Sequence, residues 1–212
     1  MTPLEMKAPV FVITGFAPFS NHSYNPSWDT AQALANSLGT SANLLDVTFE
    51  VASSFAQRHF DKLGGELAQT PVFFLHLGLA ANRDELCLEE RAHNLRGLSP
   101  DNEEARHGIQ PTVPSALIPG ELPCRSTTLA TTDLACRYNG HSPDTLPRAR
   151  ASEDCGDYVC NALYYHSLKT CEARAEAHAL FVHIPPLTPA QAILLGEELA
   201  HVLACPTSTY IA

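Results

Sequence analysis

The chain has 212 residues, of which 45% are apolar and 17% charged, a composition typical of a compact globular protein rather than a disordered one. A net charge of −10, with Lys and Arg scattered along the chain, argues against nucleic acid as a partner, because phosphate binding needs a clustered basic face. The longest apolar run, Val72 to Ala81, contains His76 and is far too short to span a bilayer, so we expect no membrane association.

Alternating strand-like and helix-like segments indicate the fold class. Five short apolar or β-branched runs predict strands: Val10–Thr14, Leu45–Val51, Val72–Leu77, Ala149–Ser152 and Ala179–Ile184. Four segments of helical spacing predict helices: Ser27–Leu38, Ser53–Leu67, Cys155–Leu168 and Pro189–Leu203. Ser27, directly after Pro26, is the candidate N-cap of the first. Because most strand runs are apolar throughout, we predict an α/β fold in a single domain, residues 1–212. Its sheet should be open, mostly parallel and twisted, with helices on both faces.

Residues 97–147 do not follow this alternation. They are rich in Pro, Gly, Ser, Thr and Asp and offer at most a short helical piece around Thr131–Arg137. A long irregular segment inside a compact domain is more often a binding or lid loop than a domain boundary. We therefore expect a loop here, not a linker.

Cysteine usage and the amino terminus favour a cytoplasmic protein. The seven cysteines are an odd number and form neither a C-x-x-C pair nor a zinc-ligand spacing with histidine, so we expect free thiols and no metal. The first ten residues contain Glu5 and Lys7 and lack the apolar stretch of a signal peptide. A reducing cytoplasm is the expected location.

Cys160 is the strongest candidate for chemistry. It lies in GDYVCN, residues 156–161, at the start of a predicted helix, where unpaired N–H groups can hold a developing oxyanion. Gly156 permits a tight turn into this helix, and Asp157 and Ser152 offer capping oxygens. A lone cysteine is more often a small buried side chain, but these neighbours favour a nucleophile whose thiolate the helix end stabilises.

A base and an orienting acid can be named for this thiol. His183 interrupts an apolar run before two prolines, so we expect it at the carboxyl end of a strand, where ligands meet open α/β sheets. A carboxylate should fix its tautomer, and spacing does not choose between Glu89 and Glu90. Composition alone does not decide whether three other histidines have a functional role: His76, His93 and His141.

Three separated motifs together resemble the pyroglutamyl peptidase I family, also called pyrrolidone carboxyl peptidases. TGFAPF at 14–19, followed by NPSW at 25–28, resembles the opening motif of the family. HLGLA at 76–80 leads to LE at 88–89 and PDN at 100–102, and GDYVCN precedes FVHIP at 181–185. The resemblance implies an open α/β fold. It also implies a cysteine omega-peptidase that removes an amino-terminal pyroglutamyl residue from peptides through a thioester acyl-enzyme, without metal or organic cofactor, and commonly as a homotetramer.

The resemblance also implies catalytic roles. Cys160 becomes the nucleophile and His183 the general base and then acid. The alignment selects Glu89 over Glu90 as the residue that orients His183. The oxyanion candidates are the Cys160 N–H and two cations, Arg83 and Arg96.

The implied substrate pocket suits a small, flat, uncharged lactam. Phe16, Phe19 and Tyr158 match positions whose rings enclose the lactam, and Asn25 matches a polar position beside it. Burying an ordinary cationic amino terminus unpaired in such a slot would be costly. For Trp28 we prefer core packing. Leu79 stands where many bacterial relatives carry Gln.

Two other functions compete with this one. A catalytically silent module could keep the pocket and bind pyroglutamyl-blocked peptides, although it would have no need for Cys160, His183 and Glu89 together. A nucleoside phosphorylase on a similar scaffold would want Gly-rich or Arg-rich phosphate loops, and Gly15-Phe16 is not such a loop.

Overall fold

The computed structural model describes residues 8–20, 22–63 and 70–203, and a six-stranded sheet forms its centre. In spatial order its strands are β2 (Ala42–Leu45), β1 (Val10–Phe16), β3 (Val72–Leu79), β8 (Ala177–Ile184), β4 (Leu86–Glu89) and β7 (Ala149–Ser152). All neighbouring pairs in this sheet are parallel except β4 with β8. A second, antiparallel sheet pairs β5 (Arg91–His93) with β6 (Cys124–Ser126).

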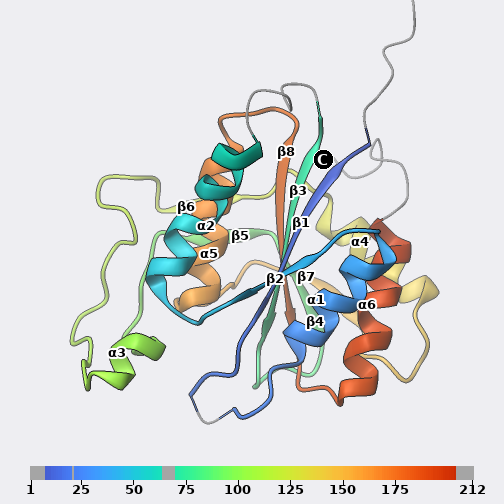
Figure 1. Ribbon diagram of the computed structural model, residues 1–212, viewed down its shortest axis with the longest axis horizontal. Coiled ribbons are helices and arrows are strands. Elements are labelled where there is room, and N and C mark those ends of the chain that lie inside the picture. The colour runs from blue at the N-terminus through green and yellow to red at the C-terminus, as the bar shows by residue number, and fades with distance from the viewer. Residues whose placement is uncertain (1–7, 21, 64–69, 204–212) are drawn as a thin grey trace, which may run out of the picture.

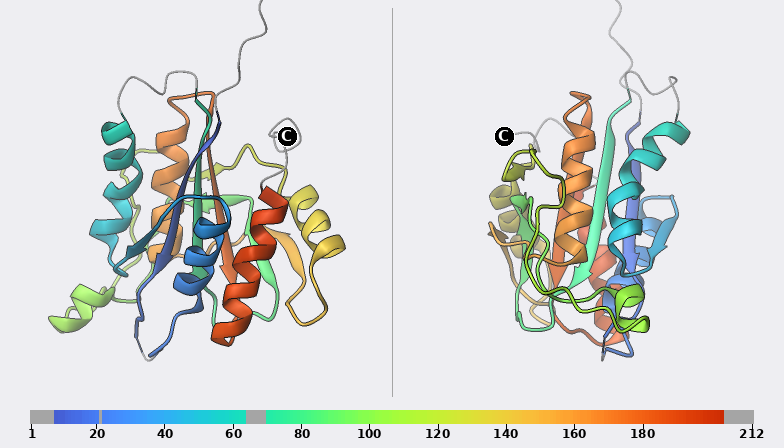
Figure 2. Two further views of the ribbon diagram at one scale, coloured as in Figure 1. Left: turned by 45° about the vertical axis from the view of Figure 1, so that its right-hand side comes forward. Right: turned by 90° about the vertical axis from the view of Figure 1, so that its left-hand side faces the viewer.

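Helices cover both faces of the six-stranded sheet (Figure 1). One face carries α1 (Pro26–Ser37), α4 (Thr131–His141) and α6 (Pro189–Leu203), and the other carries α2 (Phe49–Leu63) and α5 (Val159–Cys171). Figure 2 shows the two layers from the side, with the short α3 (Asn102–Arg106) set apart below α2. Every residue of β3 and β8 is buried, as expected for parallel strands covered on both faces. The predicted fold class is confirmed.

One predicted strand is wrong. The run Leu45–Val51 contributes only Leu45 to β2, and α2 begins at Phe49. The carboxylate of Asp101 accepts a hydrogen bond from the Phe49 N–H at 2.8 Å, and the Thr48 hydroxyl accepts one from the Val51 N–H at 3.3 Å. Capping from a distant loop therefore overrides the β-branched composition of this run.

Three predicted helix starts also differ from the structure. Asn25, not Ser27, caps α1, because its side-chain oxygen accepts the Ser27 N–H at 3.1 Å. Helix α2 starts before the predicted Ser53, and the last four residues of that prediction, 64–67, lie outside the described residues. Helix α5 starts at Val159 rather than Cys155. The expectation that there is no signal peptide concerns the first ten residues, of which the structure describes only residues 8–10.

The segment 97–147 is more ordered than its composition predicts. It contains α3 and β6, and its longest regular element is α4, whose 11 residues extend the expected helical piece to His141. Asp101 forms a capping box with Glu104 at the start of α3. Four elements are absent from the sequence-based prediction, and each is short: β4, β5, β6 and α3. Within the described residues no helix has the length and apolar character needed to cross a membrane.

Candidate active site

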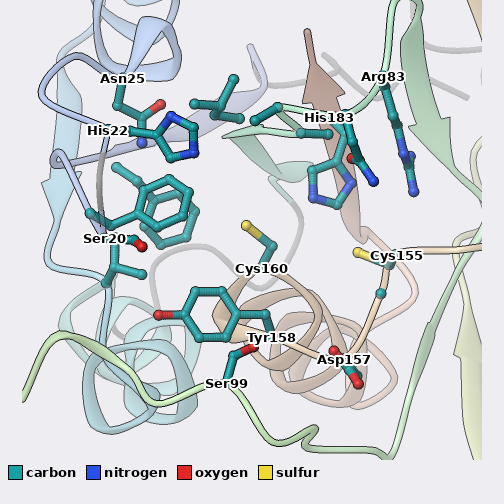
Figure 3. Close-up of a pocket in the computed structure, with 18 of the residues that line it drawn as sticks. Ser20, His22, Asn25, Arg83, Ser99, Cys155, Asp157, Tyr158, Cys160 and His183 are labelled. Atoms are coloured by element: carbon teal, nitrogen blue, oxygen red, sulfur yellow. The ribbon is translucent and has the colours of Figure 1, made fainter. Parts of the chain in front are cut away.

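A cavity of about 700 Å³ opens where β1, β3 and β8 end and α5 begins (Figure 3). This is the edge of the sheet at which open α/β proteins bind ligands. Seven of the candidate site residues named from the sequence line it: Phe16, Phe19, Asn25, Arg83, Tyr158, Cys160 and His183. In Figure 3 the Cys160 sulfur points into the cavity, between Tyr158 and the imidazole of His183.

Gly78 makes room for the Cys160 sulfur beside His183. Gly78 on β3 and His183 on β8 are register partners, so side chains from both positions project on the same face of the sheet. A Cβ added to Gly78 would lie 2.9 Å from the Cys160 Sγ. The sulfur therefore occupies the space above Gly78, on the face from which the His183 imidazole projects.

Glu89, not Glu90, contacts His183. The carboxylate of Glu89 is fully buried at the end of β4, and its Oε1 lies 2.8 Å from Nδ1 of His183. The carboxylate of Glu90 instead accepts a hydrogen bond from the Thr131 hydroxyl at 3.0 Å. With Nδ1 directed at Glu89, Nε2 is the ring nitrogen left for proton exchange with the thiol.

The environment of Cys160 favours the neutral thiol at rest. Burial, followed by the charge of Glu89, raises the pKa of Cys160 to about 12, although the hydrogen bond from its own N–H opposes this. The expectation that the helix end stabilises a standing thiolate is therefore outweighed by desolvation. A neutral resting thiol needs a base to take its proton before the sulfur can act as a nucleophile.

The N–H groups in the first turn of α5 have no acceptor within the helix. Its N-cap, Tyr158, makes no side-chain capping hydrogen bond within the described chain, and Cys160 is the second helical residue. The predicted capping oxygens are used elsewhere: the Ser152 hydroxyl accepts the Asp154 N–H at 3.3 Å, and Asp157 packs on Gly97. The predicted tight turn is confirmed at Gly156, whose φ is +74°.

Aromatic rings form one wall of the cavity. Phe16, Phe19 and Tyr158 line it, and the ring centroids of Phe19 and Tyr158 are 6.3 Å apart. The Tyr158 hydroxyl donates to the Pro100 carbonyl at 3.0 Å, which fixes its ring. Asn25 lies in the same wall and caps α1 with its side-chain oxygen, while its amide nitrogen donates to the Ala17 carbonyl at 3.1 Å.

Trp28 packs against the core cluster on the opposite face of the sheet, as preferred from the sequence.

The two arginine candidates lie in different places. Arg83 lines the cavity, but its guanidinium donates to Glu89 Oε1 at 2.7 Å and to the Asp154 carbonyl. Arg96 is not among the described residues that line the cavity. It forms an ion pair with Glu104, and its guanidinium carbon lies 4.2 Å from the Phe49 ring centroid.

The remaining histidine candidates are engaged outside the cavity. His76 is buried between the hydroxyls of Thr14 and Ser167, each at 2.9 Å. His93 contacts the Glu153 carbonyl at 3.1 Å, and His141 contacts Glu198 at the surface. In the part of the chain that the structure describes, no cluster of three or more His, Cys, Asp or Glu residues could hold a metal ion.

Sequence reasoning missed two features of the site. Apart from its place in HLGLA, nothing in the sequence marks Gly78 as part of the site. A side chain at this position would clash with the Cys160 sulfur only because α5 packs on the sheet here. His22 also lines the cavity, with its ring centroid 5.3 Å from that of Phe19, and no pattern in the sequence marked it.

Comparisons with known proteins bear on the family and the fold of this chain. The family model described as pyroglutamyl peptidase matches residues 10–205. Pyroglutamyl-peptidase 1 of Rattus norvegicus is 28% identical over 208 residues, which cover 94% of this chain and 90% of that protein. The crystal structure of pyrrolidone carboxyl peptidase from Thermus thermophilus superposes with a TM-score of 0.67 at 26% identity, covering 91% of this chain and 99% of that one. For pyroglutamyl peptidase I of Bacillus amyloliquefaciens the TM-score is 0.72 at 23% identity, with 93% and 96% covered, which shows a shared fold.

Proposed function

Because this chain belongs to the pyroglutamyl peptidase family, we propose that Cys160, His183 and Glu89 are its nucleophile, its acid–base group and its orienting acid. The chain is a cysteine-type hydrolase that removes an amino-terminal pyroglutamyl residue from peptides. One observation carries the residue assignment: the buried 2.8 Å contact between His183 Nδ1 and Glu89 Oε1, at a cavity that Cys160 also lines.

The reaction follows from these positions. The Cys160 sulfur attacks the pyroglutamyl carbonyl carbon while its proton passes to Nε2 of His183. The C–N bond then breaks as His183 returns this proton to the leaving amine, and a thioester to Cys160 is left. Water, deprotonated by His183, hydrolyses the thioester, which releases pyroglutamate and restores the thiol.

The open end of α5 supports a backbone oxyanion site. The N–H groups of the first turn have no acceptor within the helix, and Cys160 lies in that turn. We assign the oxyanion chiefly to the Cys160 N–H, because the guanidinium of Arg83 is engaged by Glu89 and Asp154. The position of Arg96 outside the cavity lining does not support an oxyanion role for it.

The aromatic wall supports selectivity for the lactam. Phe16, Phe19 and Tyr158 offer flat apolar faces, and a cavity of about 700 Å³ leaves space for the first residues of the leaving peptide. A cationic amino terminus would lose its hydration against these rings without gaining a partner ion. Pyroglutamate, which is uncharged, avoids that cost.

Further expectations extend this proposal. The family match across residues 10–205 supports a single domain. The six cysteines in the described residues are free thiols, which supports a reducing cytoplasm. We also propose the homotetramer that the resemblance implies, and the molar mass from light scattering would test it. Nothing in the site favours the silent binding module, since a binder has no need for a histidine that a buried acid orients.

Hydrolysis of a chromogenic pyroglutamyl amide, beside the matching prolyl and glutaminyl amides, tests the function. We expect turnover of the pyroglutamyl amide alone, and only in the presence of a reductant. Equal cleavage of the prolyl amide would contradict the lactam pocket. Binding of the pyroglutamyl amide without any cleavage would favour the silent module instead.

A further inference from the structure

Arg83 joins two parts of the site that are far apart in the sequence. It lies in the turn between β3 and β4, with its side chain 19% exposed beside a Glu89 side chain that is 0% exposed. One terminal nitrogen donates to Glu89 Oε1 at 2.7 Å. The other donates to the carbonyl of Asp154, in the loop that leads to α5. Both ends of the guanidinium are therefore held within the protein.

The carboxylate of Glu89 needs such a partner. Its Oε1 is shared by Arg83 and His183, and its Oε2 has no hydrogen-bond partner among the described residues. An ionised carboxylate this deeply buried is costly without a cation. With only His183 beside it, the pair would hold an extra proton, either as an imidazolium or as a neutral acid.

The other titratable groups that face this pair carry no compensating charge. They are Cys160 and Tyr164 on α5, Cys155 in the preceding loop and Cys87 on β4. Burial raises the pKa of Cys155 and of Tyr164 well above their ordinary values, so both are neutral near pH 7. Asp154 presents its carbonyl to Arg83, while its carboxylate accepts the Gly156 N–H at 3.0 Å.

Arg83 itself remains charged. Burial alone would lower its pKa, but the hydrogen bond and the charge of Glu89 outweigh this, and the net shift is upward. The guanidinium is thus a permanent cation against the acid that orients the catalytic base.

We propose that Arg83 is a positioning residue: its guanidinium keeps Glu89 ionised and aimed at Nδ1, so that His183 can stay neutral and accept the Cys160 proton. The inference rests on the proposed function of Cys160, His183 and Glu89. It gives Arg83 a role apart from the oxyanion, and it makes the pH range of activity depend on a residue that acts through Glu89. Without this cation, the imidazolium is favoured, and the acid limb of kcat/KM moves to higher pH.

Two measurements on the full-length chain test this. The first is the pH profile of kcat/KM on the pyroglutamyl amide for wild type, Arg83→Met and Arg83→Lys. The second is the NMR titration of the His183 imidazole in a Cys160→Ala background, with and without Arg83→Met. Arg91→Met is the matched control, because Arg91 pairs at 2.6 Å with Glu153, next to Asp154, and not with Glu89.

In Arg83→Met we expect the His183 titration and the acid limb of kcat/KM to rise together by at least one pH unit. Activity should recover toward the wild-type value above that limb. Arg83→Lys should keep the limb within half a unit of wild type, and Arg91→Met should not move it.

The proposal would be overturned if Arg83→Met lost activity by the same factor at every pH while His183 titrated as in wild type. That result would assign Arg83 to the oxyanion or to the fold. If Arg83→Met does not fold, Arg83→Lys decides the question, because a large loss with an unmoved limb contradicts the proposal in the same way. The NMR titration needs no turnover, so a wild-type chain that cleaves nothing would reject the proposed function without deciding the role of Arg83.

Discussion

Replacing Gly78 with alanine should remove most of the activity and leave the protein folded. The new Cβ would lie 2.9 Å from the Cys160 Sγ and 2.7 Å from the Cζ of Phe181. Non-bonded heavy atoms rest about 3.5–4.0 Å apart, so the sulfur has to move by roughly 0.6–1.1 Å and the ring by roughly 0.8–1.3 Å. The ring of Phe181 is fully buried and its centroid is 4.7 Å from that of His183, so either movement disturbs the reacting pair.

The expected magnitudes separate a displaced sulfur from a damaged fold. A misplacement of about 1 Å at a reacting group can cost about 100-fold in rate. Overpacking a core usually costs about 1–3 kcal/mol, which at roughly 2–4 °C per kcal/mol lowers Tm by no more than about 12 °C in a chain of this length.

The assay is kcat/KM on the pyroglutamyl amide at 25 °C, with Tm from circular dichroism. Gly140→Ala on α4 is the matched control, because a Cβ there meets nothing within 4 Å and activity should be unchanged. Wild-type kcat/KM in Gly78→Ala would refute the placement of the sulfur above Gly78, beside His183.

Three other variants test separate parts of the site and the core. Glu89→Gln should lower kcat/KM by about 10³–10⁴-fold, because the tautomer of His183 is no longer fixed. The control Glu90→Gln should have the kcat/KM of wild type. Equal losses in the two variants would contradict the assignment of Glu89 as the orienting acid. In His183→Ala, the rate at which iodoacetamide alkylates Cys160, followed by peptide mass spectrometry, should still rise tenfold per pH unit between pH 8 and 10. The reason is that burial, and then the charge of Glu89, raises the pKa of Cys160 to about 12. A plateau in this rate below pH 9 would contradict that pKa. Burial, with a smaller contribution from His59, lowers the pKa of His76 to about 3, so stability is fully present above pH 6.5 and is lost as the pH falls toward 3. Between pH 7 and pH 5 the wild-type protein should therefore lose about 2 kcal/mol of unfolding free energy that the His76→Gln variant does not lose. Urea titration of both proteins at the two pH values measures this difference, and equal losses would contradict it.

The sequence predicted most of the sheet because its central strands are marked by local composition. The runs that became β1, β3 and β8 are predominantly apolar, as expected for strands that are buried on both faces. Strand β4, in contrast, has four residues, too few for a periodic signal, although it carries Glu89. The start of α2 depends on Asp101, which is 52 positions away in the sequence, so no local pattern could reveal it.

The same division holds at the site. Cys160 and His183 can be named because each lies in a motif of residue types that suit the chemistry, whereas only the resemblance to the family separates Glu89 from Glu90. The space above Gly78, and the engagement of Arg83 by Glu89 and Asp154, exist only after distant segments meet. Desolvation of the Cys160 thiol is likewise a property of the packed cavity and not of its neighbours in sequence.

The most direct test of the central assignment is kcat/KM of Cys160→Ala on the pyroglutamyl amide. Cys136→Ala is the matched control, since Cys136 is an exposed free thiol on α4. The sulfur of Cys160 forms the thioester in this account, so its removal should abolish measurable turnover while Cys136→Ala retains the wild-type rate. Undiminished hydrolysis by a folded Cys160→Ala protein would show that the bond is broken by another group.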